Sequence, residues 1–123
     1  MFRRTMIAAP PLVLARISGW SLAAAIVVLS VVPATFRPES GLPHNFEHFA
    51  IYWATGLAFA LGYSLTPLLA TALVIFSAAV EILQLFVPGR HARLSDFIVD
   101  ALASVIGLIT VSLVTQTRNR TRA

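Results

Sequence analysis

Four apolar stretches, each about as long as a membrane-spanning helix, dominate this 123-residue sequence. A helix needs roughly 20 mostly apolar residues to cross the hydrocarbon core of a bilayer. Short segments rich in proline, glycine and serine separate the stretches, and such segments form turns. The pattern predicts an all-α integral membrane four-helix bundle that forms a single domain over residues 1–123. Its helices are expected at about 12–32, 45–63, 67–87 and 96–115.

The composition excludes most soluble classes of protein. Hydrophobic residues make up 58% of the chain and charged residues 11%, whereas soluble domains average about 45–50% and about 25%. Because the chain has no cysteine, disulfides, zinc–thiolate centres and thiol nucleophiles are excluded. All nine basic residues are arginines, but they lie at the chain ends and in two short stretches rather than along one face. No nucleic-acid partner is therefore expected.

The arginines also predict how the chain is oriented, since cytoplasmic segments of membrane proteins are enriched in Lys and Arg. With four helices, both termini lie on one side of the membrane, and the terminal segments carry arginines but no acid. The first and third loops, with the helix ends beside them, carry the remaining three arginines and all five acids. We expect a multi-pass protein of the cytoplasmic (inner) membrane with both termini in the cytoplasm. The terminal arginines are Arg3, Arg4, Arg16, Arg118, Arg120 and Arg122.

The first apolar stretch has an alternative interpretation as a cleaved signal peptide. Arg3, Arg4 and Arg16 precede it, and it closes on Val32-Pro33-Ala34, a small-residue pattern compatible with cleavage. We favour a retained helix, because the stretch is long enough to span and proline at the penultimate position is unfavourable. The topology of the remaining helices is the same in both cases.

Ionisable residues on three different predicted helices lie at similar depth near the outer side. At 1.5 Å per residue, His48 lies about 5 Å, Asp100 about 6 Å and Glu81 about 9 Å inside the outer helix ends. An acid at the centre of a spanning helix costs roughly 2.5–3.5 kcal/mol, and less near an end. Glu81 and Gln84 share one helix face by their spacing, as do Asp96 and Asp100. These groups should face one another in a polar pocket that opens to the outer side.

Arg90 and Arg93 lie in the predicted outward loop between the third and fourth helices, against the positive-inside trend. Their guanidinium groups can reach the buried acids or bind an anionic ligand. His48 and Glu81 are the candidate acid–base residues of the pocket. The candidate ligand-binding residues are Gln84, Arg90, Arg93, Asp96 and Asp100.

Two elements of the sequence resemble the VanZ-like family of small bacterial membrane proteins, over about residues 42–110. The first opens the second helix, and the second runs from the third helix into the fourth. The first element reads His44-Asn-Phe-Glu-His48-Phe49. The second reads Glu81-x-x-Gln84, followed by Arg90, Arg93, Ser95-Asp96, Asp100, Ala103 and Gly107. The chain differs from the usual family pattern at His44, Asn45, Asp100 and Ala103.

The resemblance implies a role in the cell envelope. The family's namesake is associated with low-level resistance to the glycopeptide teicoplanin, and most relatives have no assigned activity. It also implies that Ser95, in the Ser-Asp element of the pattern, joins the candidate ligand-binding residues.

Three functions remain open. The leading hypothesis is a membrane protein that binds or modifies an anionic headgroup, a lipid-linked component or a cell-wall precursor. The second is an enzyme that uses His48 or Glu81 in acid–base chemistry on a lipid-linked substrate, with Arg90 as the charge stabiliser. The third is an accessory subunit of a membrane complex, and the polar residues could also form a purely structural network. Without a distinctive ligand spacing such as His-Glu-x-x-His, neither a metal nor a cofactor is expected.

The remaining distinctive residues have structural interpretations. Small residues spaced four apart on the second and fourth helices predict close helix contact. Aromatic residues are expected as core or interface anchors, and the basic tail as a contact for anionic lipid. His44 and His91 are expected in loops at the membrane surface. The small residues are Gly56, Ala60, Ala103 and Gly107, and the aromatic residues are Trp20, Tyr52, Trp53 and Tyr63.

Overall fold

The computed structural model describes residues 9–123, and within that range it is built from helices without a β-strand. The elements are α1 (Ala9–Val31), the 3-10 helix η1 (Ala34–Phe36), α2 (His44–Gly62), α3 (Pro67–Gln84) and α4 (Leu94–Arg122). The predicted all-α fold with four helices is therefore confirmed. Arg3 and Arg4, on which part of the orientation argument and the signal-peptide alternative rest, lie outside the described residues.

The helix boundaries differ from the predicted ones mainly around the α3–α4 loop and at the C-terminal end. α3 ends at Gln84 because the next residues form consecutive tight turns, in which each amide donates to the carbonyl three residues earlier. Gly89 then takes a φ of 77°, which glycine adopts without steric strain. α4 begins at Leu94 and continues to Arg122, because its polar last turns contain no proline or glycine that would end a helix.

Thr66 and Pro67 define the start of α3. The Thr66 hydroxyl oxygen accepts a hydrogen bond from the Leu69 amide at 3.2 Å, which satisfies one of the unpaired N–H groups of the first turn. Pro67 follows at the first helical position, where its missing N–H is not needed. This confirms the predicted place of Pro67.

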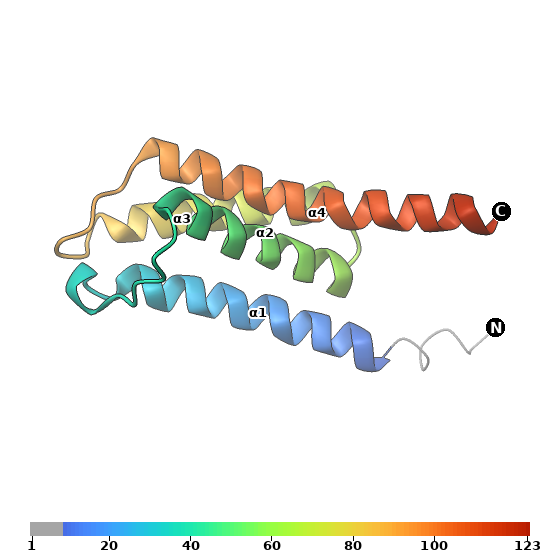
Figure 1. Cartoon of the computed structure of the whole chain (residues 1–123), viewed down its shortest axis with the longest axis horizontal. Coiled ribbons are helices and arrows are strands. Elements are labelled where there is room, and N and C mark those ends of the chain that lie inside the picture. Colours follow the sequence, from blue (N-terminus) through green and yellow to red (C-terminus); the bar gives the residue numbers. More distant parts are fainter. Residues whose placement is uncertain (1–8) are drawn as a thin grey trace.

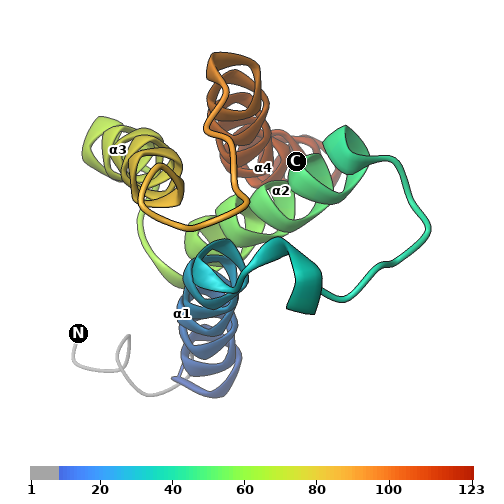
Figure 2. The same cartoon turned by 90° about the vertical axis from the view of Figure 1, so that its left-hand side faces the viewer.

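α2 is the central packing element of the bundle. It makes its most extensive contacts with α4 and the next most extensive with α1, whereas α3 packs on α4 and, less extensively, on α1. The view along the bundle shows α2 crossing between α1 and α4 (Figure 2). Because α3 connects them, α2 and α4 run in the same direction.

Two glycines allow α2 and α4 to approach closely. A Cβ atom on Gly56 would collide with the backbone of Ser104, and one on Gly107 would collide with the backbone of Trp53 and Leu57. Ala103 is fully buried in the same contact. The predicted small-residue contact between these helices is confirmed, and it fixes how the polar side chains of α2 meet those of α4.

Of the four stretches predicted to be of membrane-spanning length, three are long and apolar enough to cross a membrane within residues 9–123, namely Pro11–Val31, Pro67–Gln84 and Leu94–Arg122. α2 is of similar length but is not among them, because its first turns contain His44, Asn45, Glu47 and His48. The protein is therefore a multi-pass membrane protein whose α2 begins with polar residues. The α1–α2 and α3–α4 connections lie together at one end of the bundle, and the C-terminal end of α4 lies at the other (Figure 1).

Candidate functional site

Two histidine–aspartate pairs join α2 to α4, one helical turn apart. Nδ1 of His48 lies 2.9 Å from Oδ1 of Asp100, within hydrogen-bond distance, and Nε2 of His44 lies 3.4 Å from Oδ2 of Asp96. In both pairs the partners are 52 residues apart, because the helices are parallel and each pair of positions advances by four. The side chains of His48 and Asp100 are 11% and 1% exposed, so this pair is buried.

The position of His44 corrects the expectation that it lies in a surface loop. It is the first residue of α2, and its ring lies 4.3 Å from that of His48, measured between ring centroids. Its side chain is half exposed, whereas its partner Asp96 is buried. The His44–Asp96 pair was not predicted from the sequence. Its signal was that His44 and His48 have the same spacing as Asp96 and Asp100.

Three buried oxygen atoms lie deeper in the bundle. They are the hydroxyl of Tyr52, Oδ2 of Asp100 and Oε2 of Glu81, and none has a hydrogen-bond partner among the described residues. The Tyr52 ring stacks at 6.4 Å from the ring of His48 and is a core residue, as expected. The second carboxylate oxygen of Glu81 accepts a hydrogen bond from the backbone amide of Arg93 at 2.6 Å.

One of the two sequence hypotheses was that Arg90 binds the buried acids. Its hydrogen bonds instead go to backbone carbonyls. Its Nε donates to the carbonyl of Val32 at 3.1 Å, and one terminal nitrogen donates to the carbonyls of Leu29 and Val32 at 2.5 and 2.8 Å. These carbonyls belong to the C-terminal end of α1, where no further turn of helix provides partners. A cation at this position also interacts favourably with the helix dipole. Arg90 thus ties the α3–α4 loop to α1.

Arg37, in the connection between α1 and α2, is a site residue that sequence reasoning did not select. Its terminal nitrogen lies 3.3 Å from Oε2 of Glu47, and the Ser40 hydroxyl donates to the other oxygen of this carboxylate. The only sequence signal was an arginine in an outward loop, the same observation that selected Arg90 and Arg93.

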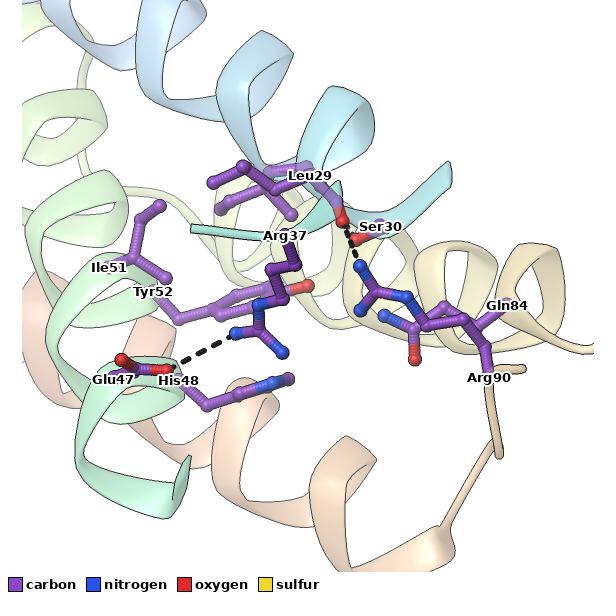
Figure 3. Close-up of a pocket in the computed structure, with 10 residues that line it drawn as sticks. Leu29, Ser30, Arg37, Glu47, His48, Ile51, Tyr52, Gln84 and Arg90 are labelled. Carbon is purple, nitrogen blue, oxygen red and sulfur yellow. Dashed lines mark hydrogen bonds and ion pairs between the residues drawn. The ribbon is translucent and has the colours of Figure 1, made fainter. Parts of the chain in front are cut away.

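A polar cavity of about 100 Å³ opens between α1, α2, the end of α3 and the α3–α4 loop (Figure 3). Side chains of Arg37, His48, Gln84 and Arg90 border one part of it, and apolar side chains of Ile26, Leu29 and Ile51 border the other. A second cavity of about 300 Å³ shares the four polar residues. It is further lined by Gly89 and by four side chains from three elements, namely His44, His91, Arg93 and Asp96.

The two cavities carry an excess of positive charge. Among residues 9–123, three arginines and two carboxylates line them, and the carboxylates of Glu47 and Asp96 pair with Arg37 and His44. Burial and, secondarily, the nearby Arg37 guanidinium lower the pKa of Arg90 from its usual value, although guanidinium groups stay charged in proteins. Two like charges therefore face one space, an arrangement that favours an anion between them.

The structure brings together most of the predicted site residues, but not all of them. The predicted residues that line both cavities are His48, Gln84 and Arg90, and those that line only the larger one are Arg93 and Asp96. Asp100 lines neither cavity but is hydrogen-bonded to His48. Glu81 lines neither polar cavity; it is buried and borders a separate cavity between α3, the α3–α4 loop and α4. Ser95 is exposed and lines neither polar cavity. Across residues 9–123, no three His, Asp or Glu side chains are grouped as ligands of a metal ion would be.

Comparison with protein families identifies a family to which most of the chain is similar. The model of the VanZ/LLP1 family matches residues 24–115, about three quarters of the chain. The chain therefore belongs to this family, as the His-Phe and Glu-x-x-Gln to Asp100 elements indicated. No curated protein and no solved structure matches it.

Proposed function

We propose that this VanZ/LLP1-family membrane protein binds, in its polar cavities, the anionic group of an envelope or lipid-linked cell-wall component. The observation that carries the proposal is the unbalanced charge of the cavities, which three guanidinium groups and two carboxylates line. One carboxylate pairs with Arg37 and the other with His44, so neither pairs with Arg90 or Arg93. A planar guanidinium group donates two parallel hydrogen bonds to a phosphate or carboxylate, so it suits such a ligand.

The side chains have different roles in this proposal. Arg37 and Arg93 contact the anion, and Gln84 adds an uncharged hydrogen bond. Arg90 holds the end of α1 in place and contributes its charge, since Nε and one terminal nitrogen already bind carbonyls. Asp100 orients His48 at the wall of the cavity. The apolar side of the smaller cavity accommodates the first carbons of a lipid chain.

The proposed site opens to the outer side of the cytoplasmic membrane, and both termini lie in the cytoplasm. This orientation rests on the positive-inside rule. Among the described residues, Arg16 and the arginines of the last turns of α4 lie at the end opposite the cavities. In this orientation the cavities face the compartment where cell-wall components are assembled.

Farnesyl phosphate and farnesol test the proposal directly, because they share an apolar chain and differ in the phosphate. The purified full-length chain is heated in detergent with each compound. We expect farnesyl phosphate alone to raise the melting temperature. Arg37→Gln or Arg93→Ala should weaken the shift and the two changes together should abolish it, while Arg118→Gln retains it. An equal response to both compounds, or a shift that survives the combined Arg37→Gln and Arg93→Ala changes, contradicts the proposal.

A glycopeptide-resistance role predicts that cells expressing the chain are less susceptible to teicoplanin. The same variants should remove this protection.

The pairing of His48 with Asp100 favours an enzyme as the second candidate function. A buried carboxylate that accepts from Nδ1 of a histidine orients the ring and leaves Nε2 to exchange protons with a substrate, as in hydrolytic triads. No hydrogen bond to Nε2 of His48 is present among the described residues. In this candidate function Arg37 and Arg90 stabilise negative charge on a lipid-linked substrate. Turnover that is lost in a folded His48→Gln variant would distinguish this enzyme from a binding protein.

A further inference from the structure

An apolar groove of about 270 Å³ lies between α1, α2 and α3, toward the end of the bundle opposite the polar cavities. Aromatic and aliphatic side chains form its walls, among them Trp20, Phe59, Tyr63, Leu69, Ala72 and Phe76. Phe59 is buried at its base, whereas Trp20 is 62% exposed at its edge. A groove of this composition on a membrane protein suits a hydrocarbon chain better than any polar ligand.

Arg16 is held at the mouth of the groove. Its Nε donates to the carbonyl of Gly62 at 2.8 Å, and its guanidinium carbon lies 4.6 Å from the centre of the Tyr63 ring. The Tyr63 hydroxyl in turn accepts from the indole N–H of Trp20 at 2.9 Å. The terminal nitrogens of Arg16 have no hydrogen-bond partner among the described residues, and the residue is exposed. A charged group with spare N–H donors is thus fixed beside an apolar groove.

We propose that Arg16 and this groove form a binding site for an anionic phospholipid, with the phosphate on Arg16 and one acyl chain against Phe59 and Phe76. Charge complementarity selects an anionic headgroup. Any lipid phosphate accepts hydrogen bonds from the guanidinium group, but the choline of a zwitterionic lipid already cancels the charge of its own phosphate, whereas an anionic lipid keeps its net charge for Arg16. Tyr63, which accepts from Trp20, follows the last residue of α2 at the end of the bundle, and tyrosine and tryptophan are enriched at the level of the headgroups. This site is separate from the polar cavities and does not depend on their function.

Quenching of tryptophan fluorescence by brominated lipids tests the site. The chain has two tryptophans, so Trp53→Phe leaves Trp20 as the only reporter. The full chain is reconstituted in phosphatidylcholine vesicles that contain increasing fractions of chain-brominated phosphatidylglycerol or chain-brominated phosphatidylcholine. We expect half-maximal quenching at an about fivefold lower fraction of the anionic lipid, as for one arginine at an anionic surface. Arg16→Gln should remove this difference.

Two matched substitutions on α3 separate the groove from the general attraction of lipid to the protein. Ala72 lines the groove, whereas Ala79 is exposed on the same helix outside it. We expect Ala72→Phe to abolish the preferential quenching and Ala79→Phe to retain it. Equal quenching by the two lipids overturns the proposal. A preference that persists in Arg16→Gln also overturns it, because the attraction then comes from the basic tail. If the chain forms dimers that Ala72→Phe dissociates, and if preferential quenching is absent, a second copy of the chain occupies the groove and the proposal is overturned. If Ala72→Phe does not fold, the Arg16→Gln comparison alone decides.

Discussion

Nδ1 of His48 lies 2.9 Å from Oδ1 of Asp100, and four residues earlier on the same two helices His44 lies 3.4 Å from Asp96. The two pairs fix the register of α2 against α4, because a shift of either helix by one residue would break both. The inner pair also has the greater energetic consequence, since its side chains are nearly inaccessible to solvent. A buried charge that loses its partner is far more costly than an exposed one.

The first prediction concerns this buried pair. Replacing one partner, in His48→Leu or Asp100→Leu, leaves the other buried and unpaired, and such a change costs about 3–5 kcal/mol. The double replacement should cost less than the sum, with a coupling energy of about 1–3 kcal/mol. Denaturation of the four proteins in detergent micelles measures this coupling.

The Arg37–Glu47 ion pair provides the control for that double-mutant cycle. Its side chains are 26% and 24% exposed, so its coupling energy should stay below about 1 kcal/mol. Equal coupling energies in the two cycles would contradict the idea that burial makes the His48–Asp100 pair the stronger one.

The second prediction concerns Arg90 as a cap on α1. Hydrogen bonds from a charged donor contribute about 1.5–3 kcal/mol, so Arg90→Ala should destabilise the protein by at least that amount. Arg90→Lys should recover only part of the loss, because an ammonium group does not reproduce the fork of donors. Since Arg90 and Glu81 share no hydrogen-bond partner, Arg90→Ala and Glu81→Gln should add within about 0.5 kcal/mol in the same unfolding assay. A large coupling would show that they interact after all.

The sequence was sufficient to predict the helices, their number and the polar end of the bundle. Apolar length and turn composition determine these features locally, as the prediction of Pro67 at the start of α3 illustrates. The positions of Gly56 and Gly107 likewise predicted a close contact, because small residues spaced along a membrane helix allow a neighbouring backbone to approach.

The partners of the charged residues could not be predicted in the same way. Arg90 had acids and backbone carbonyls within reach, and only the packing of the α3–α4 loop against α1 decides between them. Arg37 enters the cavity because the α1–α2 connection brings it to Glu47 of α2, and loop conformation has no simple periodicity to reveal this contact. Glu81 accepts a hydrogen bond from the Arg93 amide instead of a side-chain cation, and sequence spacing does not reveal a backbone partner of this kind.

The third prediction concerns the close contact of α2 and α4. Gly56→Ala would place a methyl group against the backbone of Ser104, and overpacking of this kind typically costs about 1–3 kcal/mol. Gly19→Ala is the matched control, since the nearest atoms to its Cβ would be those of the Phe59 ring, at 3.3 Å, and a side chain can move where a backbone cannot. Thermal unfolding should show a clear loss for Gly56→Ala and little change for Gly19→Ala. Similar losses would show that the contact is not specific to the backbone of α4.

The fourth prediction concerns orientation. The basic last turns of α4 should lie in the cytoplasm, because arginines accumulate on that side. A reporter enzyme that is active only outside the membrane, fused after Ala123, should therefore be inactive, and a reporter active only in the cytoplasm should be active. The opposite result would place the polar cavities on the cytoplasmic side and exclude an outward-facing site.

The last prediction separates function from stability at Arg93. The backbone amide of this residue, not its side chain, donates to Glu81, and the side chain itself is exposed at the larger cavity. Arg93→Ala keeps the amide, so the melting temperature should hardly change, as an exposed charge contributes at most about 1 kcal/mol to folding.

The same variant should nevertheless weaken the farnesyl phosphate response, and Arg93→Lys should restore it only in part because an ammonium group cannot donate bidentately. Glu81→Gln is the complementary control: it weakens the acceptor of the Arg93 amide, so it should lower stability while leaving the guanidinium group at the cavity. Thermal shift with and without farnesyl phosphate reports both effects in one experiment. A stable Arg93→Ala protein with an undiminished response would remove Arg93 from the anion site and leave Arg37 and Arg90 as its only cationic residues.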